Sequence, residues 1–215
     1  LWGLTQDSLR RTQFPLAQMT KSEVRALALR HGLRTAGKRE SFEICFVTDN
    51  SYERFLKQMR PELESQVAGG DIVLDGKTIG KHRGYPFYTI GQRKGLGLSS
   101  AKPLYVIELD AARNRVMVGD DAALARDEFV AEQCNWIAFD TPAATFQATV
   151  KIRYNHPGTP ATMTPLGRGT VKVKLHVPQR AITPGQAAVF YQEDVVLGGG
   201  WISCTVRTNA GILPA

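Results

Sequence analysis

Beyond residue 69 the chain consists of short apolar-rich runs separated by turn residues, and this pattern favours β-strands over helices. A hairpin is expected over residues 71–80, because Asp75-Gly76 at its centre suits a two-residue type I′ turn. Two further strands are expected at 104–109 and 115–118, and a change in composition near residue 125 opens a last block of closely spaced strands. Such spacing predicts a small closed β-barrel. The strands of this block are expected at 129–139, 145–154, 170–177, 187–191 and 195–205.

The opening fifth of the chain has a helical pattern instead. Thr20 and Glu23 form a T-x-x-E capping box, and apolar residues recur behind them at helical spacing. Gly32 is expected to end this helix as its C-terminal cap, and a short strand is expected over residues 42–47.

These patterns predict a mainly β fold with a short α/β portion at the N-terminus. We place the boundaries of three parts at residues 1–48, 49–124 and 125–215. The second part begins with a helix capped by Asn50 or Ser51 and continues as a small β-rich domain. The third part is the predicted barrel.

Charge limits the classes of partner. Lys and Arg number 27 against 20 Asp and Glu, so the formal net charge is +7, which favours polyanions such as RNA, DNA or a membrane surface. The longest apolar runs are far shorter than the roughly 20 residues that a membrane-spanning helix needs. The chain starts inside an apolar pattern without an initiator Met or a cleavage-site pattern, which we interpret as a truncation.

The three cysteines are widely separated and form no C-x-x-C pair, which argues against a disulfide framework or a structural metal site. A reducing cytoplasm is therefore the expected compartment. Cys45 follows Lys38 and Arg39, where positive charge would favour its thiolate, although a cysteine between Ile and Phe is more often a buried apolar residue. Cys134 and Cys204 are expected to pack in the barrel.

A glycine-rich segment, YTIGQRKGLG at residues 88–97, places Arg93 and Lys94 among three glycines. Such a loop could approach a phosphate closely while its cations neutralise the charge. It lacks the spacing of a nucleotide-binding P-loop, and a tight turn with two solvated cations explains the composition equally well.

Basic residues also alternate with apolar ones along two of the predicted strands. If these strands pair, one face of the barrel is basic and could contact a phosphate backbone, with Tyr154 or His156 available for stacking or sugar contacts. An ordinary solvated outer face is the alternative interpretation. The basic residues are Lys151 and Arg153 on one strand and Lys172, Lys174 and His176 on the other.

Five segments in order closely resemble the tRNA-specific 2-thiouridylases, over nearly the whole chain. The segments are FPLAQMTKSEVRALA (14–28), KRESFEICFV (38–47), GYPFYTIGQRKGLG (84–97), VKIRYNHPG (150–158) and AITPGQAAVFY (181–191). The resemblance implies an N-terminal adenylating domain of the PP-loop type, of which residues 1–48 are the tail, then a small central domain. A C-terminal six-stranded β-barrel similar to the second domain of elongation factor Tu follows. The S-G-G-x-D-S loop that binds ATP and a first family cysteine are expected upstream of Leu1, so the isolated chain is expected to be inactive.

The resemblance also implies an activity: ATP-dependent thiolation of C2 of the wobble uridine at position 34 of tRNA. Cys45 matches the family's I-C-F motif and is expected to carry the sulfur as a persulfide, then to form a disulfide with the upstream cysteine. Arg153, Tyr154 and Gln186 match tRNA-contact motifs, and Arg93 and Lys94 match a Q-R-K loop for which we expect RNA or interdomain contacts.

The implied partners are tRNA and a sulfur-carrier protein, with ATP and Mg²⁺ bound by the upstream domain. No membrane, DNA or metal site in this chain is expected. Two alternatives remain on the residues alone: a non-catalytic RNA-binding barrel and a protein-interaction barrel.

Overall fold

A computed structural model describes residues 1–37, 47 and 51–206. Contacts divide the chain into two compact units, one formed by residues 7–61 and the other by Leu1–Gln6 together with the chain from Glu62 onward. The boundaries predicted after residues 48 and 124 separate domains inferred from the sequence, whereas the two units group residues by contacts. Those boundaries therefore stay a prediction.

The smaller unit is helical where it is described. It contains α1 (Gln6–Arg11), which begins at the junction of the two units, then α2 (Lys21–Arg30) and α3 (Tyr52–Met59). Ser51 caps α3 by accepting a hydrogen bond from the Arg54 N–H at 3.3 Å. The strand expected over residues 42–47 lies outside the described residues except for Val47, which is buried.

Both ends of α2 form as the sequence predicts. Thr20 accepts a hydrogen bond from the Glu23 N–H, and the Glu23 carboxylate accepts from the Thr20 N–H at 2.7 Å. Hydrogen bonds from the Thr20 side chain and backbone hold the pKa of Glu23 below its usual value. Gly32 adopts φ +63°, and its N–H donates to the Leu29 carbonyl, so a left-handed residue ends the helix.

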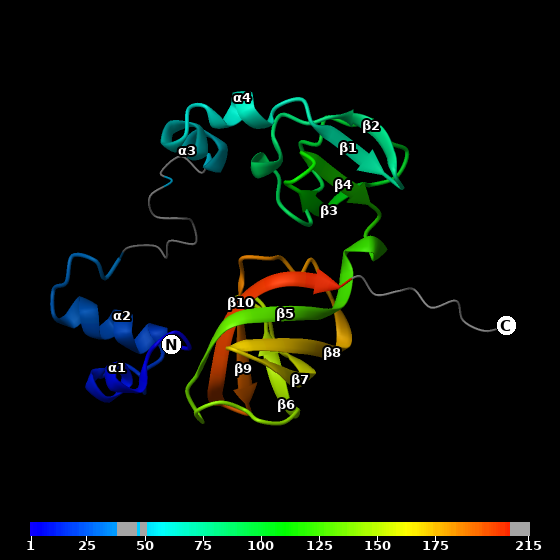
Figure 1. The fold of residues 1–215 in the computed structure, drawn as a ribbon. Helices are drawn as coiled ribbons and strands as arrows, with labels where there is room; N and C mark the ends of the chain where they lie inside the picture. Colours follow the sequence, from blue (N-terminus) through cyan, green and yellow to red (C-terminus); the bar gives the residue numbers. More distant parts are fainter. Residues whose placement is uncertain (38–46, 48–50, 207–215) are drawn as a thin grey trace. The chain divides into compact units, whose positions relative to one another are not determined.

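In the larger unit, the short helix α4 (Leu63–Val67) is followed by a four-stranded sheet. Its strands lie in the order β2-β1-β4-β3, with β1 parallel to β4 and both outer pairs antiparallel (Figure 1). The hairpin is confirmed, because Asp75 and Gly76 have φ of 48° and 78°, the two positive values that a type I′ turn requires. The strands are β1 (Asp71–Leu74), β2 (Lys77–Lys81), β3 (Tyr105–Asp110) and β4 (Arg115–Gly119).

The remaining strands form a closed barrel, as predicted. It closes in the order β10-β5-β8-β7-β6-β9, and every neighbouring pair is antiparallel. One strand, β7, was absent from the predicted strands because Pro160 and Pro165 weaken its strand pattern. The strands are β5 (Ala125–Trp136), β6 (Phe146–Lys151), β7 (Thr159–Gly167), β8 (Thr170–Arg180), β9 (Ala187–Gln192) and β10 (Val195–Val206).

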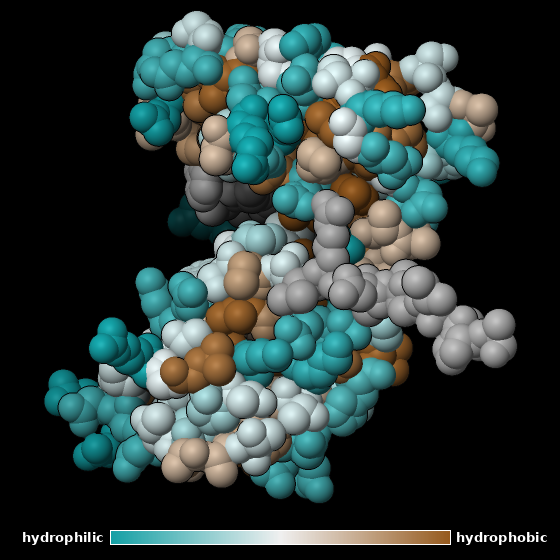
Figure 2. Space-filling view, turned by 45° about the vertical axis from the view of Figure 1, so that its right-hand side comes forward, coloured by the Kyte–Doolittle hydropathy of each residue, from teal (hydrophilic) through white to brown (hydrophobic). Residues whose placement is uncertain are grey.

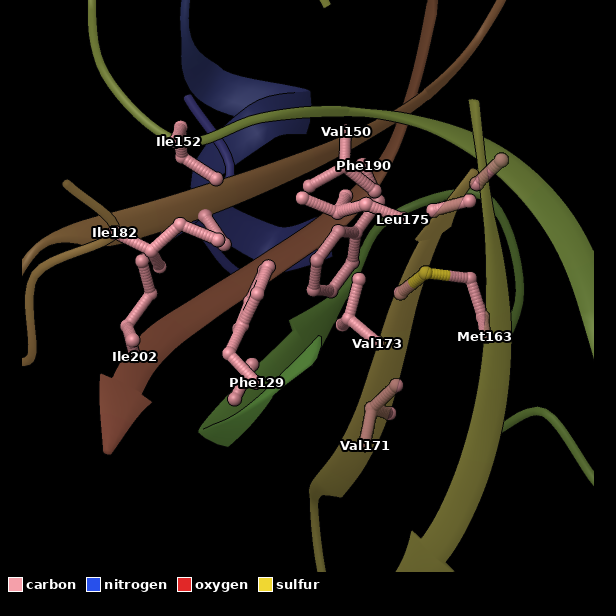
Figure 3. Close-up of a cluster of buried hydrophobic side chains, with 14 of the residues drawn as sticks. Phe129, Val150, Ile152, Met163, Val171, Val173, Leu175, Ile182, Phe190 and Ile202 are labelled. Carbon is pink, nitrogen blue, oxygen red and sulfur yellow. The ribbon is translucent and has the colours of Figure 1, made fainter. Parts of the chain in front are cut away.

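Apolar side chains at alternate positions of the strands fill the barrel interior. On β8, for example, Val171 and Val173 are buried while Lys172 between them points outward. Each strand contributes apolar side chains that meet inside the barrel (Figure 3), and this core fixes the wall on which outward-facing residues are displayed. Buried residues of the core include Phe129, Val150, Met163, Val173, Phe190 and Ile202.

The first six residues lie against the barrel, and the residues that bond to each other are 131 or 133 positions apart in sequence. The Asn135 Nδ2 atom donates to the carbonyls of Trp2 and Leu4 at 2.6 and 2.9 Å. Gln6 Nε2 donates to the Ile137 carbonyl at 2.6 Å. These bonds anchor the segment to the end of β5.

The described helices include none that is long and apolar enough to cross a bilayer. On the face drawn in Figure 2, hydrophobic side chains are interspersed among hydrophilic ones.

Candidate nucleic-acid interface

A pocket of about 540 Å³ opens on the outer wall of the barrel. Its size lies within the range of small-molecule sites, roughly 300–1,000 Å³. Two cations, three aromatic rings and one side-chain amide line it. These residues are Lys151, Arg153, Tyr154, Gln186, Tyr191 and Trp201.

Strand order explains why these residues meet. β9 pairs with β6 on one side and with β10 on the other, so residues from three sequence segments share one stretch of wall. Lys151 lies opposite Val189 in the β6–β9 pair, and its Nζ atom sits 5.1 Å from the centre of the Tyr191 ring. Trp201 lies opposite Ala187 in the β9–β10 pair. The ammonium–ring contact is a cation–π interaction that holds Lys151 beside the pocket.

Arg153 and Tyr154 follow β6 in a loop that a buried histidine fixes. His156 is only 5% exposed; its Nδ1 accepts from the Gly158 N–H at 3.2 Å, and its Nε2 lies 2.9 Å from Gln179 Oε1. The His156 N–H also donates to the Arg153 carbonyl. The prediction that His156 is available for stacking or sugar contacts is therefore wrong, because its ring is buried and both ring nitrogens have partners within the protein. Tyr154, in contrast, is 94% exposed.

Gln186 projects from a tight turn between β8 and β9. Its N–H donates to the Thr183 carbonyl, Pro184 occupies the second position and Gly185 has φ +84°, which together define a type II turn. The side chain of Gln186 is exposed and has no hydrogen-bond partner among the described residues. Its amide can therefore donate to, or accept from, a bound molecule.

The structure does not bring Arg93 and Lys94 into this pocket. Both are exposed in the loop before β3, and Arg93 lines a separate pocket of about 500 Å³ formed with residues 95–104. The loop is shaped internally, since Gln92 accepts from the Thr89 N–H and donates to the Lys94 carbonyl. Gly95 with φ +74° permits the tight turn.

The predicted basic face joining two strands is wrong. β7 lies between β6 and β8, so the two basic strands do not pair. On β8, Lys172 forms an ion pair with Glu128 at 3.2 Å and Lys174 one with Asp127 at 2.8 Å. Acidic residues of β5 thus neutralise the charges of these two lysines. Arg153 lines the barrel pocket and is not part of a basic face shared with β8.

The predictions made for the three cysteines compare differently with the structure. Cys45 lies outside the described residues. Cys134 packs against the barrel core as predicted, and burial, together with the charge of Glu132, raises the pKa of its thiol to about 11. Cys204 is exposed, so its predicted packing is wrong; an irregularity in the β5–β10 pairing after Ile202 breaks the two-residue alternation there.

Alkylation should separate the two described thiols. At pH 8 Cys134 is almost entirely a neutral thiol, because its pKa is raised to about 11, and iodoacetamide reacts with thiolate. We expect Cys204 to be labelled first, and Cys134 labelling to accelerate as the pH rises toward 11. Peptide mass mapping after timed labelling measures this, and equal rates at pH 8 would show that Cys134 is not shielded.

Within the described part of the chain, no three His, Cys, Asp or Glu side chains lie together as a metal site. The barrel pocket itself presents two cations, three aromatic rings and one side-chain amide. This combination suits a polyanion with aromatic bases.

Three family models match consecutive parts of the chain. Residues 1–49 match a tRNA methyl transferase HUP domain, residues 53–120 a tRNA methyl transferase PRC-barrel domain, and residues 126–202 an aminomethyltransferase beta-barrel domain. The pocket lies in the last of these.

Relatives match almost the whole chain. The tRNA-specific 2-thiouridylase MnmA of Chlorobium chlorochromatii is 51% identical over 203 residues, which are 94% of this chain and 56% of the relative. The protein of the same name from Symbiobacterium thermophilum is also 51% identical, over 96% of this chain and 53% of the relative. The chain belongs to the tRNA-specific 2-thiouridylase family. A third 2-thiouridylase, from Geotalea uraniireducens, is 48% identical over 99% of this chain and 56% of the relative.

The chain spans about half the length of these 2-thiouridylases. The names of the matching family models mention methyl transfer, whereas the relatives that match nearly the entire chain are named 2-thiouridylases. The barrel pocket therefore belongs to a member of the 2-thiouridylase family.

Proposed function

We propose that this chain is part of an ATP-dependent sulfurtransferase that replaces O2 of the wobble uridine, position 34 of tRNA, by sulfur. The names of relatives at 48–51% identity support the reaction. The observation that carries the role of the described residues is the barrel pocket, which gathers Arg153 and Tyr154 with Gln186 from a turn about 30 residues away.

In this proposal the barrel pocket contacts tRNA. Arg153 and Lys151 neutralise phosphates, Gln186 hydrogen-bonds to sugar or base edges, and the exposed Tyr154 ring offers a stacking face. Arg93 and Lys94 form a second, separate RNA contact on the glycine-rich loop. Phosphate contacts position the RNA, so this surface provides affinity and orientation for the reacting base.

The chemistry requires a sulfur-bearing thiol, and we assign that role to Cys45. A carrier protein's persulfide passes its outer sulfur to the Cys45 thiolate, leaving a carrier thiol and a Cys45 persulfide. The uridine O2 attacks the α-phosphate of ATP and expels pyrophosphate, and the adenylyl group that it receives makes O2 a leaving group. A second cysteine then attacks the Cys45 sulfur and releases hydrosulfide, which adds to C2 and expels AMP with the oxygen. The resulting disulfide is reduced by an external thiol before the next turnover.

The remaining assignments follow from this reaction. ATP and Mg²⁺ bind residues outside this chain, and none of the described residues is assigned to them. A sulfur-carrier protein and tRNA are the partners, and the cytoplasm, where thiols stay reduced, is the compartment. Residues 1–48 belong to the adenylating domain, 49–124 to the central domain and 125–215 to the barrel.

Binding of tRNA tests the role of the pocket. We expect Arg153→Ala and Gln186→Ala each to raise the Kd for tRNA by roughly 10-fold, because each removes a hydrogen bond to the RNA, charge-assisted in the case of Arg153. The log–log salt slope of Arg153→Ala should fall by about one. Filter binding at several salt concentrations measures both quantities.

Lys172→Ala is the matched control, since it removes one positive charge from the same barrel outside the pocket, where Glu128 already pairs with it. It should bind tRNA nearly as well as the wild type. Equal losses in Lys172→Ala and Arg153→Ala would indicate general attraction to the barrel and would remove the pocket from the proposal.

A further inference from the structure

Trp201 has an unusual setting for a tryptophan. It lies on β10 in the wall of the pocket and is 46% exposed, although large aromatic rings bury much of their surface in most proteins. No sequence motif pointed to it.

Trp2 supports the Trp201 ring from the N-terminal segment. The two ring centres are 5.4 Å apart and the planes meet at 78°, an edge-to-face contact. Gly199 makes room for Trp2, because a Cβ atom at that position would lie 2.8 Å from the Trp2 ring. The bonds from Asn135 to the Trp2 and Leu4 carbonyls fix the segment in place. Trp201 is therefore an exposed ring with a fixed support.

The neighbours of Trp201 define what could cover it. The same pocket holds Lys151 and Arg153, whose charges suit phosphates, and the exposed ring of Tyr154. Positive charge beside exposed aromatic rings is the arrangement by which proteins bind unpaired nucleotides, with bases on rings and phosphates on cations. A base inside a duplex stacks on its neighbours and cannot present its face to Trp201.

We propose that Trp201 stacks on an unpaired base of bound tRNA while Lys151 and Arg153 contact its flanking phosphates, and that Trp2 is a positioning residue for Trp201. This inference rests on the proposed function, that tRNA occupies the pocket. It adds the kind of nucleotide bound and two residues that the motifs do not mark.

Substitution of Trp201 tests the stacking contact. Trp201→Ala should raise the Kd for tRNA roughly 5- to 150-fold, the range found for loss of base–aromatic stacking. Trp201→Phe keeps an aromatic face and the contact with Trp2, so it should retain most of the affinity. Leu166→Ala, which removes an exposed apolar side chain of the same barrel outside the pocket, is the control and should not change the Kd. Wild-type affinity in Trp201→Ala would overturn the proposal.

A double-mutant cycle tests the positioning role of Trp2. Trp2→Ala should weaken tRNA binding less than Trp201→Ala does, and should cause no further loss in a Trp201→Ala background. If Trp2→Ala weakens tRNA binding by the same factor in the Trp201→Ala background as in the wild type, Trp2 acts independently of Trp201 and has no positioning role.

Fluorescence tests the kind of nucleotide. A single-stranded RNA pentamer should quench the tryptophan emission of the chain, and a duplex of the same composition should not. The quenching should disappear in Trp201→Phe. Equal quenching by the duplex would overturn the assignment to an unpaired base. If Arg153→Ala weakens tRNA binding while Trp201→Ala does not, the stacking inference fails and the proposed role of the pocket in tRNA binding stands; if neither variant weakens binding, both fail.

Discussion

Cys45→Ser is expected to abolish 2-thiolation of tRNA by the full-length enzyme. A serine hydroxyl cannot accept a persulfide sulfur, because sulfur transfer proceeds by attack of a thiolate on a sulfur atom. Affinity for tRNA should stay close to that of the wild type, since the proposed RNA contacts belong to the barrel pocket and the glycine-rich loop, and Cys45 belongs to neither. Thiolated nucleoside measured by mass spectrometry and Kd measured by filter binding give the two results.

Cys204→Ser is the matched control, because Cys204 is an exposed thiol to which the reaction assigns no role. It should thiolate normally. Normal thiolation by Cys45→Ser would remove that residue from the reaction and leave the alternative of a barrel that binds RNA without catalysis.

Phe129→Ala is expected to destabilise the barrel by about 3–5 kcal/mol, the usual cost of removing a buried phenyl ring. Phe129 lies on β5, has no exposed surface and belongs to the core shared by all strands of the barrel (Figure 3). Because β5 pairs with both β8 and β10, the cavity would weaken the closure of the barrel. Urea unfolding followed by tryptophan fluorescence measures the loss, since Trp136 packs against this core.

Leu166→Ala serves as the comparison for this experiment. Leu166 is 56% exposed, so its truncation removes little buried area and should change the unfolding free energy by less than about 0.5 kcal/mol. A similar small change in Phe129→Ala would contradict the assignment of Phe129 to the barrel core.

Local chemistry made several elements predictable. The Thr20–Glu23 capping box and Gly32 depend only on neighbouring residues, and both ends of α2 form as expected. The Asp75-Gly76 turn needs two residues with positive φ, a requirement that few dipeptides satisfy. The close spacing of the predicted strands then made the barrel predictable.

Non-local features escaped prediction. Strand pairing placed β7 between β6 and β8, and no period in the sequence specifies which strands become neighbours. The two prolines of β7 weaken its strand pattern, so this strand was not predicted. The pairing irregularity after Ile202 shifted Cys204 to the exposed side, and such an irregularity leaves little trace in hydrophobic alternation.

The site was predicted only in part. Motifs identified Arg153, Tyr154 and Gln186, which the barrel gathers into one pocket, but not Trp201. The proposed stacking role of Trp201 depends on β10 lying beside β9 and on the edge-to-face contact with Trp2, neither of which follows from sequence spacing. The loop that carries Tyr154 is fixed by His156, whose burial was also not evident from its polar surroundings in sequence.

Photocross-linking of tRNA to the chain, followed by peptide mapping, tests most directly whether RNA occupies the barrel pocket. If it does, cross-linked nucleotides will be found on peptides that contain Tyr154, Tyr191 or Trp201. Cross-links confined to the β8 peptide that carries Lys172 and Lys174, with none on the pocket peptides, would contradict the proposal.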